Sequence, residues 1–157
     1  MKLKSFSIGF SLMELTLVLA LFLLLLGGAM ASLSAFYANS QQGSYSADVV
    51  QSLRRAQANS LSRYQNSPWG VNLDTAGNQF ILFKGTTYAT RDTSFDEITK
   101  FPASLVFQNI ALSGGGTQIA FAMTTGKTAG GSFDVVDTLR NRHTVITLNS
   151  YGQIEVQ

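Results

Sequence analysis

The stretch SIGFSLMELTLVLALFLLLLGGAMA, residues 7–31, decides how this chain is built. From Phe10 onward it is apolar except for two hydroxyl residues and Glu14. An α-helix rises about 1.5 Å per residue, so this run spans roughly 30 Å, the thickness of a bilayer hydrocarbon core. The run therefore predicts a transmembrane helix. Lys2 and Lys4 precede it, which predicts that the N-terminus stays on the cytoplasmic side.

Charge separates this N-terminal segment from the rest of the chain. Only 13% of the residues are charged, against about a quarter in a typical globular protein. The formal net charge of +2 comes from Lys2 and Lys4, and after residue 9 acidic and basic side chains balance. No basic patch is predicted that would favour nucleic acid as the primary ligand. The chain has no cysteine, which excludes disulfides, thiolate metal sites and cysteine nucleophiles.

Two common kinds of N-terminal segment leave Glu14 unexplained. A secretory signal peptide has an apolar region of roughly 7 to 15 residues, followed by a cleavage site of small residues. The run here is longer, although residues 29–31, Ala-Met-Ala, resemble such a site. A plain signal anchor explains length and orientation only. An ionisable group in a membrane segment costs at least about 2.5–3.5 kcal/mol on insertion scales, so Glu14 is a candidate functional residue that needs a partner.

The spacing of Gly9, Phe10 and Glu14 before an unbroken apolar helix resembles the class III signal of type IV pilins and type II secretion pseudopilins. Glu14 is the fifth residue counted from Phe10 in SIG-FSLMELTLVLALFLLLLG. The resemblance implies that a prepilin peptidase cuts between Gly9 and Phe10 on the cytoplasmic face and N-methylates Phe10. Residues 1–9 would then be a cleaved leader, and residues 10–33 a transmembrane and assembly helix.

Cleavage at this position would create a positive charge at the new N-terminus, and Glu14 carries the opposite charge. The new α-amino cation at Phe10 has no counter-ion in its own vicinity, whereas Glu14 of a neighbouring subunit can supply one. A buried charge is costly unless it is paired, so pairing requires the correct stagger between helices. Glu14 is therefore predicted to set the register of assembly, as a polar position does in a coiled coil. The plainer interpretation is a glutamate tolerated near the headgroups.

Gly27 and Gly28 lie within the apolar run. Glycine costs about 1 kcal/mol in a helix interior relative to alanine. The pair is interpreted either as a point of helix flexibility, where the helix bends or melts when subunits leave the membrane, or as a site of close packing between neighbouring helices.

Helical periodicity continues over residues 34–67, where apolar or aromatic residues recur mostly at intervals of three, four or eight. The stripe consists of Leu33, Phe36, Tyr37, Tyr45, Val49, Leu53, Ala56, Leu61 and Tyr64. This amphipathic extension is predicted to pack on the sheet that follows it. Pro68 disfavours helix at Ser67, so the helix is expected to run from Phe10 to about Gln65.

The period changes to two from Trp69, which indicates strands. Residues 69–74 and 79–84 form a hairpin around the turn at residues 74–78, and the second strand is apolar on both faces. A second hairpin surrounds residues 149–152 near the C-terminus. The remaining candidate strands are residues 97–101, 105–110, 118–123, 131–136, 144–149 and 153–157.

The expected fold class is α+β, with a long N-terminal helix packed on a mostly antiparallel β head at residues 68–157. The segments SADVVQSLRRAQANSLSRYQNSPWGVNLD and HTVITLNSYGQIEVQ are similar to the head of FimT/GspH-type minor pilins and pseudopilins. Many major pilins close a C-terminal loop with a disulfide. This chain has no cysteine to do so, which favours a minor subunit.

No constellation in the sequence predicts catalysis, a cofactor or a metal. His143 is the only histidine and is expected at a solvated strand edge. Two acidic groups have enough oxygen atoms for calcium, but their spacing fits no known loop and they are predicted to be surface carboxylates. These groups are Asp134 with Asp137, and Asp92 with Asp96 and Glu97. Residues 114–116, Gly-Gly-Gly, lack the Lys-Ser/Thr of a phosphate loop, and Trp69 is expected in the core.

The function implied by the resemblance is a structural subunit of a type IV pilus, a DNA-uptake pilus or a type II secretion pseudopilus. Its expected partners are prepilin peptidase, other pilins or pseudopilins, the inner-membrane assembly platform and the lipid bilayer. Nucleic acid is a partner only in a DNA-uptake pilus, where Arg54, Arg55 and Arg63 are candidate contacts. The expected location is the inner membrane, single-pass with the head extracytoplasmic, and then the filament. The alternative is a membrane-anchored β domain that binds a surface ligand without assembling.

Overall fold

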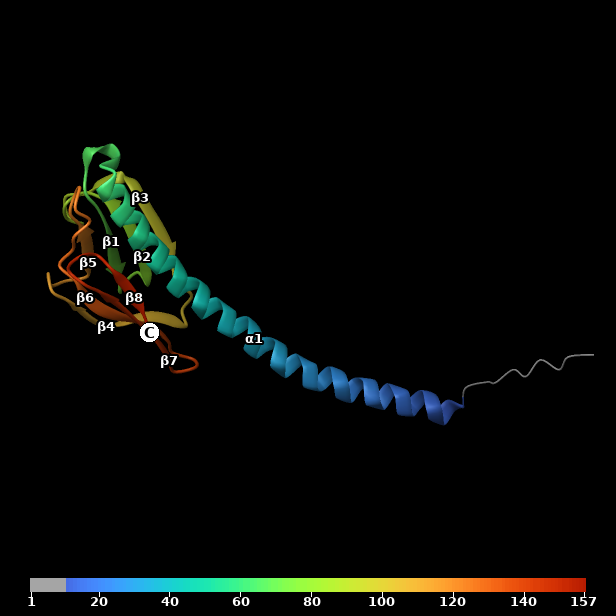
Figure 1. Ribbon diagram of the computed structural model, residues 1–157. Coiled ribbons are helices and arrows are strands. Elements are labelled where there is room, and N and C mark those ends of the chain that lie inside the picture. The colour runs from blue at the N-terminus through green and yellow to red at the C-terminus, as the bar shows by residue number, and fades with distance from the viewer. Residues whose placement is uncertain (1–10) are drawn as a thin grey trace, which may run out of the picture. The chain divides into compact units, whose positions relative to one another are not determined.

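The computed structural model describes the backbone of residues 11–157 and the side-chain surroundings of residues 11–26 and 44–157. The chain divides into two compact units, Met1–Gln41 and Gln42–Gln157. One helix, α1 at Leu12–Leu61, belongs to both units, and a short 3-10 helix follows it at Tyr64–Asn66 (Figure 1). The strands are β1 Trp69–Asp74, β2 Gln79–Lys84, β3 Asp92–Lys100, β4 Leu105–Leu112, β5 Gln118–Phe121, β6 Gly131–Asp137, β7 Arg142–Leu148 and β8 Ile154–Val156.

The second unit contains two four-stranded sheets in which every pairing is antiparallel. The strand order is β3-β2-β1-β5 in the first sheet and β4-β6-β7-β8 in the second. The α+β class with antiparallel sheets agrees with the prediction. Both predicted hairpins form, β1 with β2 and β7 with β8. The outermost strands, β3 and β5 in one sheet and β4 and β8 in the other, each have one edge without a partner strand.

The first sheet is covered on both faces, which explains why the interior of β2, Phe80 to Phe83, is apolar on both faces. Trp69, Val71 and Leu73 of β1 point into the main core. On the opposite face, Phe83 is fully buried, and the ring of Tyr88 packs against it with centroids 5.6 Å apart. Tyr88 belongs to the connection between β2 and β3, and its backbone N–H donates to the side-chain oxygen of Gln118 on β5. This connection therefore covers the second face.

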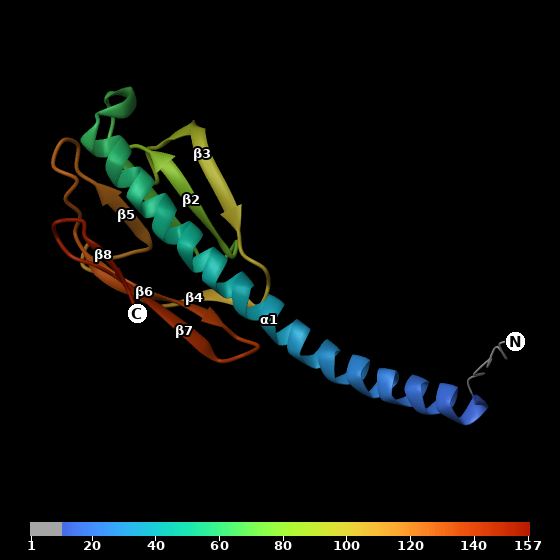
Figure 2. The same cartoon turned by 45° about the vertical axis from the view of Figure 1, so that its right-hand side comes forward.

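Helix α1 contributes one row of side chains to the core of the second unit. Val49, Leu53 and Ala56 are completely buried at spacings of four and three, as an amphipathic helix requires. They join a single cluster with residues of both sheets, so the helix holds the two sheets together (Figure 2). Phe101 links the helix to the second sheet, because its ring packs against Tyr45 at 5.7 Å and Phe107 at 4.7 Å.

The helix ends at Leu61, earlier than the expected end near Gln65. Arg63 and Gln65 have positive φ angles of 54° and 56°, a left-handed conformation that stops an α-helix. The cause lies one turn earlier, where the buried hydroxyl of Ser60 accepts a hydrogen bond from the N–H of Trp69 at 2.8 Å. This bond draws the start of β1 back against the helix. As a result Leu61 and Tyr64, predicted to continue the buried stripe, are 48% and 49% exposed.

Strand β3 begins at Asp92, five residues before its predicted start at Glu97. Its first residues are polar and exposed, so they lack the alternation that identifies a strand. They are held by contacts across the sheet: Lys84 of β2 lies 3.4 Å from the carboxylate of Asp92 and 4.1 Å from the ring centre of Phe95. The strand edge is thus extended by an ion pair and a cation–π contact.

Candidate functional site

The predicted cleavage site lies outside the described residues, since these begin after Gly9 and Phe10. The first described turn of α1 is capped by Ser11, whose hydroxyl accepts the backbone N–H of Glu14 at 3.2 Å. Serine followed three residues later by glutamate is a known start signal for helices. The Glu14 side chain is exposed. Within residues 11–26 and 44–157 its carboxylate has no ion-pair partner.

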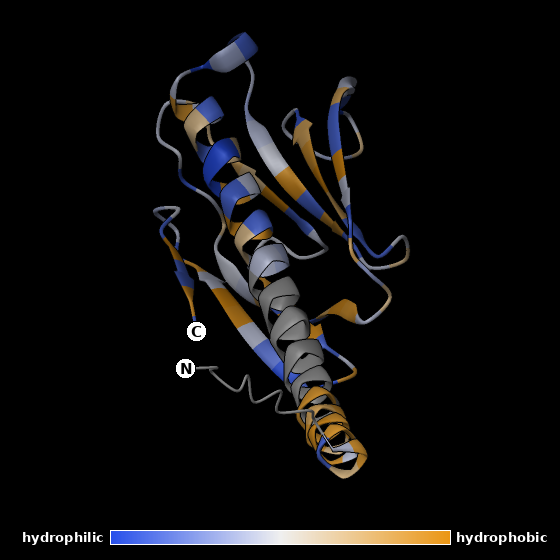
Figure 3. Ribbon diagram, turned by 90° about the vertical axis from the view of Figure 1, so that its right-hand side faces the viewer, coloured by the Kyte–Doolittle hydropathy of each residue, from blue (hydrophilic) through white to orange (hydrophobic). Residues whose placement is uncertain are grey.

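The next turns of α1 expose apolar side chains on every face (Figure 3). The large ones are Leu12, Met13, Leu15, Leu17, Val18, Leu19, Leu21, Phe22, Leu23, Leu24, Leu25 and Leu26. A helix that is apolar all round is normally buried, either in a membrane or among other helices. Among the residues described with their side chains, no helix has both the length and the apolar character needed to cross a membrane. Gly27 and Gly28 lie within α1, and their surroundings fall outside the described side chains.

The three arginines considered as nucleic-acid contacts lie in different surroundings. Arg55 forms a bidentate ion pair with Glu97 of β3, its two terminal nitrogens lying 2.7 and 2.5 Å from the carboxylate oxygens. Arg54 is exposed on α1, and Arg63 occupies the left-handed turn after the helix. The role of Arg55 visible in the structure is therefore to tie α1 to the edge strand β3.

Asp134 and Asp137 are not surface carboxylates, which corrects the prediction. Asp137 is 2% exposed and accepts hydrogen bonds from the Arg140 guanidinium and from the backbone N–H of Leu139, both at 3.0 Å. Burial raises the pKa of Asp137, but Arg140 and these hydrogen bonds outweigh it and hold the pKa below the usual aspartate range. Asp134 is 9% exposed and accepts the side-chain N–H of Asn109 at 2.6 Å.

The second acidic group is also engaged in contacts within the head. Asp92 accepts both the hydroxyl and the N–H of Ser94, and these bonds hold its pKa below the usual range. Asp96 pairs with Arg91 at 2.8 Å. His143 is exposed on β7, 3.9 Å from the Asp134 carboxylate. Within the described residues, no three acidic, histidine or cysteine side chains gather as metal ligands would.

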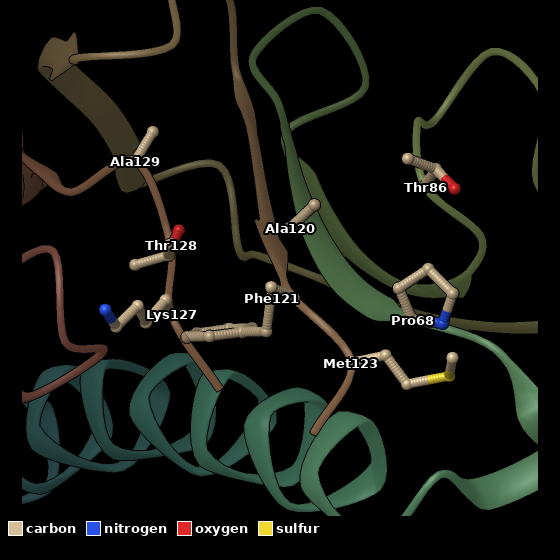
Figure 4. A pocket seen from close by; sticks show the side chains of 9 residues that line it. Pro68, Thr86, Ala120, Phe121, Met123, Lys127, Thr128 and Ala129 are labelled. Atoms are coloured by element: carbon tan, nitrogen blue, oxygen red, sulfur yellow. The ribbon is translucent and has the colours of Figure 1, made fainter. Parts of the chain in front are cut away.

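A cavity with a volume of about 570 Å³ opens beside β5 (Figure 4). Its wall is formed by Ala120 to Met123 on one side, by Lys127 to Ala129 on the other, and by Pro68 and Thr86 at one end. A polar cavity of about 330 Å³ lies between α1 and β3, around the Arg55–Glu97 pair and Trp69. Trp69 itself is 3% exposed, as predicted for a core residue.

The sequence contained signals for some of these features and not for others. Ser11 belongs to a recognisable S-x-x-E capping pattern, although the prediction attended only to Glu14. The cavity beside β5 depends on segments that are adjacent only after folding, and nothing in the local pattern of small residues indicates it.

Comparison with known proteins supports the fold. No protein-family profile matches the chain, and no curated protein matches it in sequence. Among solved structures, the chain is similar to the minor pseudopilin EpsH from the type 2 secretion system of Vibrio cholerae. The two share 10% identity with a TM-score of 0.57, over 74% of this chain and 96% of EpsH. At this identity the likeness concerns architecture, so the chain has a pseudopilin-like fold.

Proposed function

We propose that this chain is a structural subunit, a minor pilin or pseudopilin, of a type IV pilus, a DNA-uptake pilus or a type II secretion pseudopilus. One observation carries the proposal: an exposed helical segment at residues 12–26, apolar except for Glu14 and Thr16, leads into a head with a pseudopilin-like fold. The spacing of Gly9, Phe10 and Glu14 supports it, because it resembles the class III signal.

The apolar segment needs an environment other than water. Burying one large aliphatic or aromatic side chain contributes about 1.5–3 kcal/mol, and twelve such side chains are exposed on α1 between Leu12 and Leu26. A surface of this size marks a contact with lipid or with protein. In the proposed cycle it faces the inner membrane before assembly and the helices of neighbouring subunits afterwards, so one surface serves two environments in turn.

The proposed route begins with prepilin peptidase, which cuts between Gly9 and Phe10 and N-methylates Phe10. The inner-membrane assembly platform then receives the subunit, with its head extracytoplasmic, and adds it to other pilins or pseudopilins. Glu14 of one subunit pairs with the α-amino group of Phe10 of another. The Ser11 cap is compatible with this role, because it uses the backbone N–H of Glu14 and leaves the carboxylate exposed.

The mass of the mature N-terminus tests the proposal. We would express the full chain with a prepilin peptidase and analyse the purified protein by mass spectrometry. The expected product begins at Phe10 and carries one additional methyl group. Gly9→Val should remain uncleaved, because a branched side chain replaces the glycine of the signal, whereas Ser7→Ala should be processed. An intact Met1 in the parent chain, or cleavage after Ala31, would instead indicate a plain anchored β domain or a secreted one.

A second test addresses Glu14 itself. Glu14→Leu should be cleaved normally but excluded from filaments, because it removes the partner of the α-amino group while keeping the helix apolar. Thr16→Val is the matched control, since it removes a polar group two residues away that only bonds the carbonyl of Met13. Sheared filaments would be probed for each variant by immunoblotting. Wild-type incorporation of Glu14→Leu would refute the pairing.

A further inference from the structure

A groove runs along the outer edge of β5. The cavity of about 570 Å³ and a smaller one of about 120 Å³ share Ala120, Thr128 and Ala129, so they adjoin each other along this strand. The larger cavity ends at Pro68 and Met123, and the smaller one at Gly114 and Gly115. β5 is the last strand of its sheet and pairs only with β1, so the groove follows an edge that no other strand covers.

The groove lies between β5 on one side and residues 127–130 on the other, and these two segments are called its arms. The groove is closed at the end where the chain turns back after β5. The backbone N–H of Ala122 donates to the carbonyl of Lys127 at 2.7 Å, and its carbonyl accepts the N–H of Gly126 at 2.9 Å. These two bonds close a tight loop after β5. Beyond them the two arms separate, because Thr128 donates its N–H to the carbonyl of Ser150, in the turn between β7 and β8. The chain therefore leaves β5 and opens a gap between the arms (Figure 4).

The backbone of Ala120 faces this gap. Leu73 of β1 donates its N–H to the carbonyl oxygen of Thr117 at 2.9 Å. Every second residue after Thr117 therefore directs its backbone N–H and C=O toward β1. In an antiparallel ladder the intervening residues turn their N–H and C=O groups to the other edge. Ala122 confirms this alternation through its bond to Lys127. In the described part of the chain, Ala120 makes no backbone hydrogen bond outside the β1–β5 ladder.

The lining chemistry selects an uncharged occupant. Eight of the fifteen lining residues are alanine, glycine or threonine, which leave room for another backbone to approach β5 closely. No carboxylate lines the groove, and Lys127 is the only ionisable residue among the lining residues of the two cavities. Its ammonium group lies 5.5 Å from the ring centre of Tyr151, in the turn between β7 and β8, and its side chain points away from β5 (Figure 4).

We propose that this groove binds an extended, uncharged peptide segment of a partner protein, which pairs with the outer edge of β5 as an added strand. Unpaired N–H and C=O groups on a strand edge recognise another extended backbone, and flanking pockets select its side chains. The recess favours a single segment over the edge of a folded sheet, because the arm at residues 127–130 would collide with further strands. Four to six residues would occupy the length of β5, at about 3.3 Å per residue.

The absence of native cysteine allows a direct test by disulfide trapping. Ala129→Cys places a thiol on the exposed arm of the groove. The full-length variant in detergent micelles would be equilibrated, under mildly reducing conditions, with a library of acetylated and amidated hexapeptides. Each peptide carries one central cysteine and otherwise varies between uncharged β-branched residues and charged ones. Intact-mass spectrometry identifies the peptides that are captured.

Ala103→Cys is the matched control, an exposed alanine in the turn before β4, at the opposite end of that strand from the groove. We expect uncharged, β-branched peptides to be enriched at least about tenfold at position 129 relative to position 103, a difference near 1.4 kcal/mol. Partition of apolar peptides into micelles affects both variants equally. Equal capture at the two positions, or preference for charged peptides, would overturn the proposal.

A second variant tests the pairing with β5. Ala120→Pro removes the outward N–H while keeping the hydrogen bonds that join β5 to β1, a substitution tolerated on strand edges. In the Ala129→Cys background it should lower peptide capture to the level of the Ala103→Cys control. Circular dichroism would verify that the sheets remain intact. Unchanged capture in a folded variant would exclude strand addition. None of these readouts depends on peptidase processing, so they test the groove separately from filament assembly.

Discussion

At the scale of single residues, Gly70 shows how closely two strands approach in the head. A β-carbon built on Gly70 would lie 2.6 Å from the carbonyl oxygen of Ile119 and 2.7 Å from the ring of the fully buried Phe83. The oxygen belongs to the backbone of the neighbouring strand β5, so it cannot turn away as a flexible side chain would. The absence of a side chain at this position lets Phe83 cross over β1.

Gly70→Ala should therefore destabilise the head by about 1–3 kcal/mol, the usual range for overpacking a filled core. Thermal unfolding followed by circular dichroism in detergent would measure the change. Gly114→Ala is the control, because its added carbon would meet only the side chain of Ala129, at an ordinary 3.5 Å. Equal melting temperatures for Gly70→Ala and the parent would show that β5 or Phe83 shifts readily.

At the scale of elements, α1 acts in the second unit as the third layer of the core. Leu53 is fully buried in the cluster that joins the helix to both sheets, whereas Leu61 in the last turn of the same helix is 48% exposed. The contrast separates the packing contribution of a leucine from its helix propensity, because both residues lie in α1.

Leu53→Ala should lower the free energy of unfolding by about 2–5 kcal/mol, through lost burial and the cavity left behind. Leu61→Ala should cost less than about 1 kcal/mol, since surface substitutions generally have small effects. Urea unfolding monitored by the fluorescence of Trp69, the single tryptophan, would report both variants. Similar losses for the two variants would contradict the burial of Leu53 between the helix and the sheets.

The presence of a strand was easier to predict from the sequence than the residues at which an element begins or ends. The β1–β2 hairpin was predicted with the observed limits because alternating apolar residues flank a turn-forming segment. The end of α1 was predicted too late, because neither glycine nor proline marks it and the decisive contact, Ser60 to Trp69, spans nine residues. The start of β3 was also predicted too late, since its polar first residues are held to β2 by the Lys84–Asp92 ion pair.

The features of the candidate site also differ in whether the sequence reveals them. Glu14 and the apolar segment of α1 are visible in the sequence, because both depend only on local spacing. The burial of Asp137 was missed, since a Thr-Leu-Arg turn directly after it looks solvent-exposed. The groove beside β5 was missed as well, because it forms between residues that meet only when the loop at residues 122–127 closes.

At the scale of the whole molecule, three aspartates make the head sensitive to acid. The pKa of Asp74 is lowered by the N–H of Gly77 and the side chain of Gln79, that of Asp92 by Ser94, and that of Asp137 by Arg140 and Leu139 despite its burial. Each carboxylate binds a proton less readily in the folded state than in the unfolded chain. Between the two pKa values the unfolded state holds more protons, so stability falls as the pH falls.

The urea midpoint should therefore stay nearly constant above about pH 5 and drop steadily below the usual aspartate range near pH 4. Asp137→Asn should make this drop shallower, because the amide does not titrate. A midpoint that rises on acidification would mean that the folded state, and not the unfolded chain, binds the additional protons.

The buried row that α1 contributes to the second unit has a mechanical consequence. A pull along the axis of α1 within this unit loads the row of Val49, Leu53 and Ala56 at once. To pull the helix out of the head, these side chains and the Arg55–Glu97 pair must slide past both sheets together. Contacts that share a force in this way resist it jointly, whereas contacts peeled one after another fail singly. Within the second unit, α1 is therefore held against a pull along its axis by its whole buried row together.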